Sequence, residues 1–229
     1  PSRTADFRMR MFNADGSEGQ MCGNGVRCVA KYVYDYGLTP KTQITLETPA
    51  GIKELRMTLG EDCKVSAVRV DMGPAILDPA AIPVKSALPR FIDQPIQVGD
   101  RTFRATCVSM GNPHAVVCVR DPAAFDLYRW GPLFEHHPLF PHRVNTEFIR
   151  VDDPHTVTMR VWERGSGETL ACGTGACAAV VAGVLLGKCP RDEDVTVHLL
   201  GGDLVIRYCE DDRVLMTGPA VTICDGTIE

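Results

Sequence analysis

One stretch of this chain occurs twice, at residues 10–37 and, 150 positions later, at residues 160–187. The first copy reads "RMFNADGSEGQMCGNGVRCVAKYVYDYG" and the second reads "RVWERGSGETLACGTGACAAVVAGVLLG". The identical residues are Arg10 and Arg160, Glu18 and Glu168, Cys22 and Cys172, Gly23 and Gly173, Gly25 and Gly175, and Gly37 and Gly187. A long period with only two copies indicates two pseudo-symmetric halves rather than a solenoid.

Each copy places a cysteine directly before a Gly-x-Gly, in "CGNG" at residues 22–25 and in "CGTG" at residues 172–175. Apolar residues then recur at helical spacing between Val26 and Val33. Gly37 is a typical residue for the end of such a helix. The pattern therefore predicts that both cysteines lie at the N-terminal ends of helices.

The second predicted helix, residues 176–186, is apolar throughout, so it must be buried on every side. Strands are predicted at residues 7–12, 44–48, 52–59, 66–72, 157–162, 195–200, 204–208 and 213–217. Many short strands near a fully buried helix indicate a curved sheet wrapped about it. The expected fold class is α+β, with two pseudo-symmetric halves, each a strongly curved, mostly antiparallel, barrel-like sheet around a central helix.

A proline-rich segment at residues 76–95 is the predicted connector between the halves. We expect the N-terminal half to comprise residues 1–95 and to be completed by the C-terminal strand, at about residues 217–229. The C-terminal half is then residues 96–216.

The composition excludes several classes of protein. A net charge of −5 without a basic run argues against nucleic-acid binding. The longest apolar run, Ala176–Leu186, is too short to span a membrane. The 10 cysteines include no C-x-x-C pair, which argues against zinc, and they predict a reducing cytoplasm rather than a disulfide framework. Cys107, Cys118 and Cys209 lie in apolar runs and are expected to fill the core.

A cysteine at a helix start lies in the field of free backbone N–H groups and of the helix dipole. That field favours a bound anion and lowers the pKa of a thiol. Two such helix starts would provide two carboxylate sites and two thiols, a set suited to removing a proton from one face of a carbon and delivering one to the other face. The alternative is that both cysteines only pack beside their helix caps.

Several motifs together resemble the diaminopimelate epimerase family, and they cover almost the whole chain in order. They are "FNADGSEGQMCGNGVRC", "SMGNPHAVV", "VNTEFI", "VWERGSGETLACGTGACA" and "MTGPA". The resemblance implies two similar halves, each a curved sheet around a central helix. It also implies interconversion of LL- and meso-diaminopimelate for lysine and peptidoglycan synthesis, without metal or pyridoxal phosphate. A cytoplasmic homodimer is expected, with a small amino acid as its substrate.

The resemblance also implies a role for individual residues. Cys22 and Cys172 correspond to the two acid/base thiols. The residues that correspond to the group holding the reacting carboxylate are Gly23, Asn24, Gly173 and Thr174. His114 and Glu163 correspond to the pair that tunes the pKa of the thiols, and Glu163 also to a partner of the substrate ammonium group. The residues that correspond to the group holding the distal end of the substrate are Asn13, Asn112, Asn145 and Arg164.

Simpler roles stay open for some of these residues. The three asparagines and His114 are also typical of turns, and Glu163 with Arg164 also suits a surface ion pair. Two other functions stay open as well. The chain is alternatively a racemase or epimerase of another amino acid on the same scaffold, or a catalytically silent binding protein.

The sequence departs from the family in one respect. Members of the family begin with a strand, a Gly-x-Gly-Asn-Asp loop and further strands that precede the first segment seen here. We therefore expect an N-terminal segment to be missing, and the first half to show fewer strands and an open sheet edge. An inactive, truncated form is the alternative that this expectation leaves open.

Overall fold

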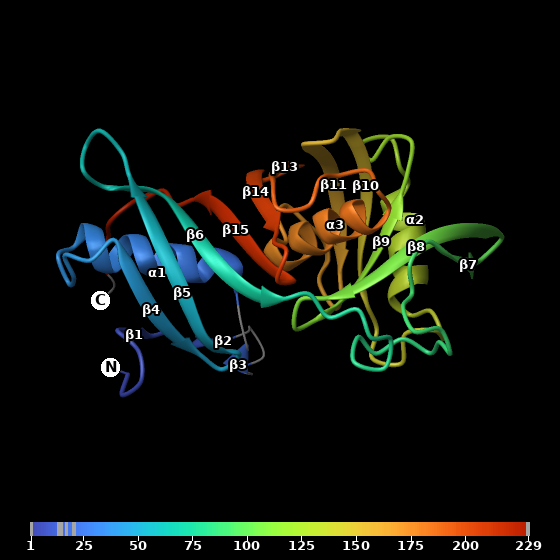
Figure 1. The fold of residues 1–229 in the computed structure, drawn as a ribbon, viewed down its shortest axis with the longest axis horizontal. Helices are drawn as coiled ribbons and strands as arrows, with labels where there is room; N and C mark the ends of the chain where they lie inside the picture. The colour runs from blue at the N-terminus through green and yellow to red at the C-terminus, as the bar shows by residue number, and fades with distance from the viewer. Residues whose placement is uncertain (1, 13–15, 17, 20–21, 228–229) are drawn as a thin grey trace. The chain divides into compact units, whose positions relative to one another are not determined.

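The computed structural model describes residues 2–12, 16, 18–19 and 22–227, and the chain forms two compact units (Figure 1). The first unit comprises Pro1–Asp71 and Thr217–Glu229, and the second comprises Met72–Met216. The chain passes between the units within two strands, β6 (Val65–Pro74) and β15 (Arg213–Pro219).

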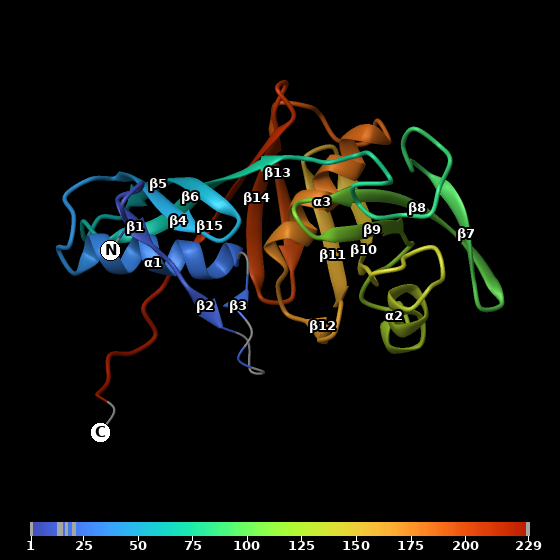
Figure 2. The same cartoon turned by 90° about the horizontal axis from the view of Figure 1, so that it is seen from below.

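The described part of the first unit contains one helix, α1 (Gly23–Asp35), on a twisted sheet. The strands, besides β6 and β15, are β1 (Phe7–Arg8), β2 (Met11–Phe12), β3 (Glu18–Gly19), β4 (Gln43–Thr48) and β5 (Gly51–Leu59). In the described part of this unit the strand order is β1-β4-β5-β6-β15, with β2 and β3 as a separate hairpin. Figure 2 shows α1 lying along one face of this sheet, which it meets at β5.

The second unit contains two helices and a longer sheet. The helices are α2 (Leu127–Glu135) and α3 (Gly173–Leu185). The strands are β7 (Gln94–Val98), β8 (Arg101–Ser109), β9 (Pro113–Cys118), β10 (Asn145–Asp153), β11 (Thr156–Glu163), β12 (Gly167–Thr169), β13 (Asp194–Leu199) and β14 (Gly202–Tyr208). Their order is β14-β13-β11-β10-β9-β8-β7, with β12 beside β11. Most neighbours are antiparallel, while β9 with β10 and β11 with β13 are parallel.

The helix α3 is enclosed by this sheet, as its composition predicts. Every residue from Gly175 to Gly183 is buried, and the helix contacts β8, β9, β10, β11, β13 and β14 (Figure 1). An apolar helix gains stability from such enclosure because all of its surface leaves water. The α+β prediction, with a curved sheet around a buried helix, is confirmed for this unit.

The internal repeat is visible in the geometry of the two units, each taken by itself. The helices α1 and α3 begin and end 150 residues apart, and the hairpins β2–β3 and β11–β12 share one register. Each hairpin carries the same ion pair, Arg10 Nε to Glu18 Oε1 at 2.9 Å and Arg160 Nε to Glu168 Oε1 at 2.7 Å. The matched glutamates thus brace two hairpins.

Each helix also ends in the same way. Gly37 and Gly187 have φ angles of 71° and 68°, a left-handed conformation that glycine adopts without a steric cost. Their N–H groups donate to Tyr34 O and Val184 O, which satisfies carbonyls of the last helical turn. The duplicated unit therefore extends from the hairpin to the helix stop.

Three local expectations, for the strand at residues 7–12, for Cys118 and for Cys209, were wrong, and one helix was missed. The strand predicted at residues 7–12 is divided, because Phe7–Arg8 pairs with β4 whereas Met11–Phe12 pairs with β3. Cys118 is exposed at the end of β9, and Cys209 is only partly buried, so neither fills the core. The helix α2 was not predicted, since Pro132 lies inside it and proline normally interrupts a helix.

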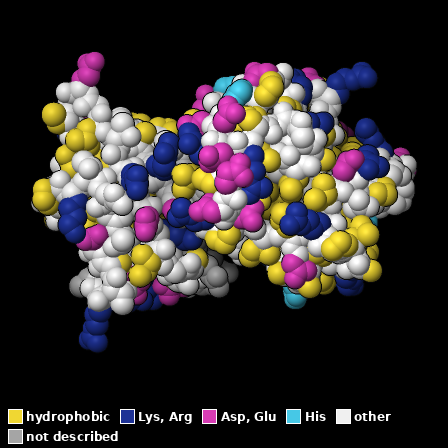
Figure 3. All heavy atoms as spheres, in the orientation of Figure 1, with side chains coloured by type: hydrophobic (Ala, Val, Ile, Leu, Met, Phe, Trp, Pro, Cys, Tyr) yellow, Lys and Arg dark blue, Asp and Glu magenta, His cyan; other side chains and the backbone are white. Residues whose placement is uncertain are grey.

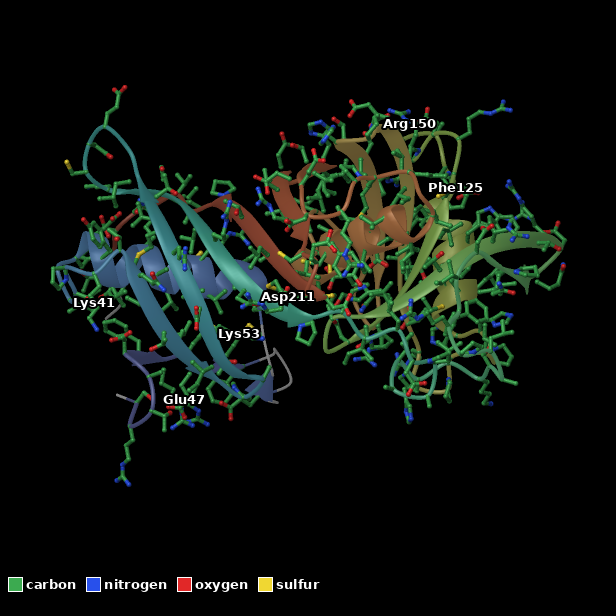
Figure 4. All side chains as sticks on the ribbon, viewed as in Figure 1. Lys41, Glu47, Lys53, Phe125, Arg150 and Asp211 are labelled. Atoms are coloured by element: carbon green, nitrogen blue, oxygen red, sulfur yellow. The ribbon has the colours of Figure 1, made fainter. Side chains whose placement is uncertain are left out.

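The proline-rich segment is more than a connector. Its residues Ile82, Val84 and Phe91 are buried in an apolar core of the second unit, together with residues of α2 such as Phe134. Phe125, labelled in Figure 4, packs on Phe148 of β10 with 4.4 Å between ring centroids. The structure accordingly groups residues 72–95 with the second unit.

Charged side chains of both signs are interspersed on the face drawn in Figure 3. Among the residues that the structure describes, no helix is long and apolar enough to cross a membrane.

Asp6 closes part of an exposed sheet edge in the first unit. Its carboxylate accepts hydrogen bonds from Lys41 Nζ at 2.6 Å, from Thr45 N at 2.8 Å and from the Thr45 hydroxyl at 3.0 Å. Lys41 is labelled in Figure 4, and Thr45 lies in β4 beyond the short pairing with β1. The bonds from Lys41 and then Thr45 lower the pKa of Asp6 to about 2.

We therefore predict that Asp6→Asn lowers the free energy of unfolding of this chain in a pH-dependent way. A depressed carboxyl pKa stabilises the folded state above the unfolded-state pKa of about 3.9, and this stabilisation is lost as the pH falls through about 2. Urea unfolding of both proteins between pH 6 and pH 2 measures the difference, which should be largest near pH 6 and should shrink toward pH 2. Glu54→Gln, on the exposed face of β5, is the matched control, and an equal pH dependence in both variants contradicts the prediction.

Candidate active site

The two repeated cysteines occupy the same backbone position at the two helix starts. Cys22 is the N-cap of α1, with φ −137° and ψ 109°, and Cys172 is the N-cap of α3, with φ −126° and ψ 108°. Neither helix, both fully described, has an acidic residue in its first turn. The N–H groups of each first turn therefore form a positive helix end without a built-in anion. The predicted placement of both cysteines at helix starts is confirmed.

In the second unit a chain of polar contacts leads from the interior to Cys172. Glu147 Oε1 lies 2.7 Å from His114 Nδ1, and His114 Nε2 lies 3.0 Å from Asn112 Oδ1. Asn112 Nδ2 donates to Thr174 Oγ1 at 3.2 Å, and Thr174 Oγ1 lies 3.5 Å from Cys172 Sγ. The fold thus connects four predicted site residues, His114, Asn112, Thr174 and Cys172, by side-chain contacts.

The strands β9 and β10 bury the inner end of this chain. The side chains of His114 and Glu147 are fully buried. Side chains alternate along β10, so Phe148 packs in the core formed with α2 while Glu147 reaches the start of α3. A carboxylate is thereby held between a sheet and an apolar helix.

Cys172 lies in surroundings that oppose its ionisation. Burial, and then the negative charges of Glu163 and Glu147, raise the pKa of the Cys172 thiol well above its ordinary range. The hydrogen bond with Thr174 acts in the opposite direction and lowers that pKa. These surroundings favour the thiol form of Cys172 over the thiolate.

Glu163 lies at the end of β11, next to a tight turn. Its carboxylate accepts a hydrogen bond from the Thr169 hydroxyl. Gly165 follows with φ 78°, and its N–H donates to Glu135 Oε1 at 2.9 Å. Glu135 is itself buried and accepts a second bond, from Trp162 Nε1 at 2.8 Å. A buried carboxylate on α2 thus fixes the turn that begins at Arg164, directly after Glu163.

Asn145, the first residue of β10, contacts Arg164 in this turn. Asn145 Oδ1 accepts the N–H of Arg164 at 2.9 Å, and Asn145 Nδ2 donates to Pro113 O at 3.0 Å. The Arg164 side chain is exposed, and its guanidinium donates to His142 O at 3.0 Å. Asn145 is therefore a structural link between three segments, while Arg164 reaches toward solvent.

The helix start of the first unit has different partners. Cys22 is partly buried, and its Sγ accepts the N–H of Gly25 at 3.3 Å. Arg27, which is buried, donates to Asn24 Oδ1 at 3.0 Å, to Gly23 O at 3.0 Å and to Pro219 O at 3.2 Å. Asn13, the remaining predicted residue, lies outside the described residues.

Two residues at these sites were missed from the sequence. Glu147 is a charged residue directly before the apolar pair Phe148 and Ile149 in the strand "VNTEFIRV", and that contrast was the available signal. Arg27 lies four residues after Gly23 in a helix whose neighbouring positions are buried, which is a similar signal. Within residues 2–12, 16, 18–19 and 22–227, no group of three or more His, Cys, Asp or Glu side chains is placed to hold a metal ion.

Comparison with known proteins identifies close relatives. The sequence model of a family described as "Diaminopimelate epimerase" matches residues 1–77 and 106–223. A diaminopimelate epimerase from Agathobacter rectalis is 57% identical, over 100% of this chain and 82% of its own length. Those from Acetivibrio thermocellus and Methanococcus maripaludis are 55% and 54% identical, each over 100% of this chain, and over 81% and 82% of their own lengths.

Solved structures share the fold at lower sequence identity. A probable proline racemase from Agrobacterium radiobacter K84 superimposes with a TM-score of 0.72 and 18% identity, over 98% of this chain and 74% of its own. A phenazine biosynthesis protein of the PhzF family from Bacillus anthracis gives a TM-score of 0.67 and 16% identity, over 95% of this chain and 78% of its own. These similarities establish the fold alone.

The repeated glycines Gly25 and Gly175 offer a matched test of the packing at the two helix starts. A Cβ at Gly175 would lie 2.7 Å from Glu147 Oε1 and 3.2 Å from Cys172 Sγ, whereas among the described residues the nearest neighbours of a Cβ at Gly25 would lie at 3.5 Å. Because Glu147 is buried and bonded to His114, its carboxylate has little room to move aside.

We predict that Gly175→Ala destabilises the chain by about 1–3 kcal/mol, the usual cost of overpacking a filled site. Gly25→Ala should be neutral or stabilising by up to about 1 kcal/mol, since alanine favours a helix. Chemical unfolding of both variants measures the free energies. Equal effects on stability would contradict the asymmetry described for the two helix starts.

Proposed function

The chain belongs to the diaminopimelate epimerase family, and we propose that it interconverts LL-2,6-diaminopimelate and meso-diaminopimelate without a cofactor. The observation that carries this proposal is an identity of 54–57% to diaminopimelate epimerases, extending over the entire chain. Two cysteines at matched helix starts support it, because they supply the two acid/base groups that inversion of a stereocentre requires.

In the proposed mechanism Cys22 and Cys172 serve one α-carbon. One sulfur, as thiolate, removes the α-proton, and the other, as thiol, delivers a proton to the opposite face. The reverse direction exchanges the two roles, so the titrations of the two thiols are coupled. This chemistry needs no electron sink other than the substrate's own carboxylate.

We propose that the two helix starts stabilise that carboxylate. Negative charge moves into it as the α-proton leaves, and N–H groups of a helix start are suitable donors for such charge. The residues proposed to hold it are Gly23, Asn24, Gly173 and Thr174. Arg27 supports Asn24 in this role, because its guanidinium donates to the Asn24 side chain and to Gly23 O.

The remaining residues are proposed to tune the thiols and to bind the rest of the substrate. His114 and Glu163 are proposed to adjust the ionisation of the thiols. The negative charge of Glu163 repels a Cys172 thiolate and, after burial, is the next largest cause of the raised pKa of Cys172. Glu163 also meets the substrate ammonium group. The distal amino acid end is held by Asn13, Asn112, Asn145 and Arg164.

The reaction implies a place in metabolism. We propose that the chain acts in lysine and peptidoglycan precursor synthesis, in the cytoplasm and as a homodimer, as the family resemblance implies.

The proposed activity is tested by substrate-dependent exchange. LL-diaminopimelate incubated with the protein in heavy water should incorporate deuterium at the α-carbon and yield the meso form, resolved by chiral chromatography. Proline, histidine and lysine serve as comparison substrates. Exchange with one of these, and none with diaminopimelate, contradicts the proposal.

We predict that Cys22→Ser and Cys172→Ser each reduce kcat/KM by about 100-fold or more, because each removes one of two acid/base groups. Cys28→Ser and Cys118→Ser are matched controls, since both side chains are exposed, and they should retain activity. Circular dichroism checks that the variants fold. Full activity in either active-site variant would refute the two-thiol mechanism.

A second prediction concerns substrate specificity and Arg164. Arg164→Ala should reduce kcat/KM for diaminopimelate by a factor equivalent to roughly 2–4 kcal/mol, because a guanidinium that pairs with the distal carboxylate is lost. A monocarboxylic amino acid should lose little. Arg120→Ala, another exposed arginine of the second unit, is the control. An equal decrease for both substrates contradicts the assignment of Arg164 to the distal carboxylate.

A further inference from the structure

A buried carboxylate stands at the inner end of the polar chain in the second unit. Glu147 is fully buried, and only one of its oxygens, Oε1, has a partner, which is His114 Nδ1 at 2.7 Å. The other oxygen, Oε2, is buried without a hydrogen-bond partner among the described residues. A buried carboxylate is costly unless a neighbouring group neutralises it, and His114 is the group in contact with it.

The second ring nitrogen of His114 also meets an oxygen. His114 Nε2 lies 3.0 Å from Asn112 Oδ1, and the amide of Asn112 is oriented by Nδ2, which donates to Thr174 Oγ1 at 3.2 Å. A ring that has an oxygen acceptor at each nitrogen forms both hydrogen bonds only when it carries two protons. The geometry therefore favours an imidazolium paired with a carboxylate.

The direction of these bonds continues to the sulfur. Thr174 Oγ1 receives the Asn112 amide proton, so its own hydroxyl proton is available to Cys172 Sγ, at 3.5 Å. We propose that Glu147 is a positioning residue, which keeps both nitrogens of His114 protonated and thereby directs the chain of hydrogen bonds through Asn112 and Thr174 onto the Cys172 sulfur. The contribution of these hydrogen bonds to catalysis rests on the proposed function of Cys172.

Other ionisable groups face the same site. Burial, with a smaller contribution from Glu147, raises the pKa of Cys107 in β8. Burial, Glu163 and Glu147 raise the pKa of Cys172. The negative charge of Glu147 disfavours the Cys172 thiolate. The series of hydrogen bonds through His114, Asn112 and Thr174 has the opposite effect and favours that thiolate. The two effects have opposite signs, and this allows one substitution to separate them.

The first test is the proton count on His114. Long-range proton–nitrogen correlation spectra of the full chain with ¹⁵N-labelled histidine, with His114→Asn to assign the signal, should show two protonated ring nitrogens at neutral pH. In Glu147→Gln, which keeps the shape of the side chain but removes its charge, one nitrogen should be unprotonated. A single proton on the ring in the parent protein, or two in Glu147→Gln, overturns the proposal.

The second test is the ionisation of Cys172, followed by its alkylation with iodoacetamide and peptide mass spectrometry. Loss of the directed hydrogen bond should slow alkylation of Cys172 in Glu147→Gln roughly three- to tenfold, the effect of one hydrogen bond. An unchanged or faster rate shows that Glu147 acts by charge alone and overturns the proposal. Glu147→Asp, which retains a carboxylate, should restore part of the parent rate, and its failure to do so also counts against the proposal.

Thr146→Val is the matched control, because Thr146 is the buried neighbour of Glu147 on the same strand and its hydroxyl also has no partner among the described residues. Thr146→Val should change neither the proton count on His114 nor the alkylation rate of Cys172, and a change equal to that of Glu147→Gln overturns the proposal. If Glu147→Gln does not fold, the proposal is tested by the His114 spectrum of the parent protein and by the alkylation rate of Glu147→Asp. Neither readout requires epimerase activity, so an inactive parent protein refutes the proposed function without affecting this test.

Discussion

Between Ala176 and Gly183, α3 carries no charged side chain and no hydroxyl or amide group. Such a helix is stable in water only when other elements cover all of its sides, and six strands of the second unit do so. The first turn of an enclosed helix still has backbone N–H groups without partners in the helix. The N-terminal end beside Cys172 is therefore the polar end of an otherwise apolar element, and the side chains of Asn112, Thr174 and Glu147 lie there.

The duplication has preserved this helix start and changed what surrounds it. The hairpins, the Arg–Glu braces and the glycine helix stops agree between the units. The side chains that pack against the two helix starts differ, since Met9 lies next to Gly25 whereas Glu147 lies next to Gly175. A repeated backbone with different supporting side chains gives two cysteines with the same position on their helices but different chemical surroundings.

The elements that the sequence predicted well are those with a strong local signal. The helix starts at both cysteines follow from Cys-Gly-x-Gly, and α3 follows from its uninterrupted apolar run. The helix α2 did not follow, because tertiary packing of residues such as Phe134 outweighs the local effect of Pro132. Family resemblance named His114 and Asn112, but the contact of His114 with Glu147 depends on the parallel pairing of β9 and β10, which no local pattern specifies.

Unequal surroundings suit the proposed chemistry. An epimerase that uses two thiols must hold one proton between them, so that one sulfur is ionised while the other is not. Identical surroundings would leave that proton equally shared, with no preferred starting state. Burial, Glu163 and Glu147 raise the pKa of Cys172, while the hydroxyl of Thr174 offsets part of this effect. Cys22 lies in a less buried site, although both sulfurs interact with the backbone N–H three residues later, Cys22 with that of Gly25 and Cys172 with that of Gly175. In the mechanism that we propose, these surroundings favour Cys172 as the proton donor in one direction, and in the reverse direction the hydrogen bond from Thr174 stabilises the Cys172 thiolate.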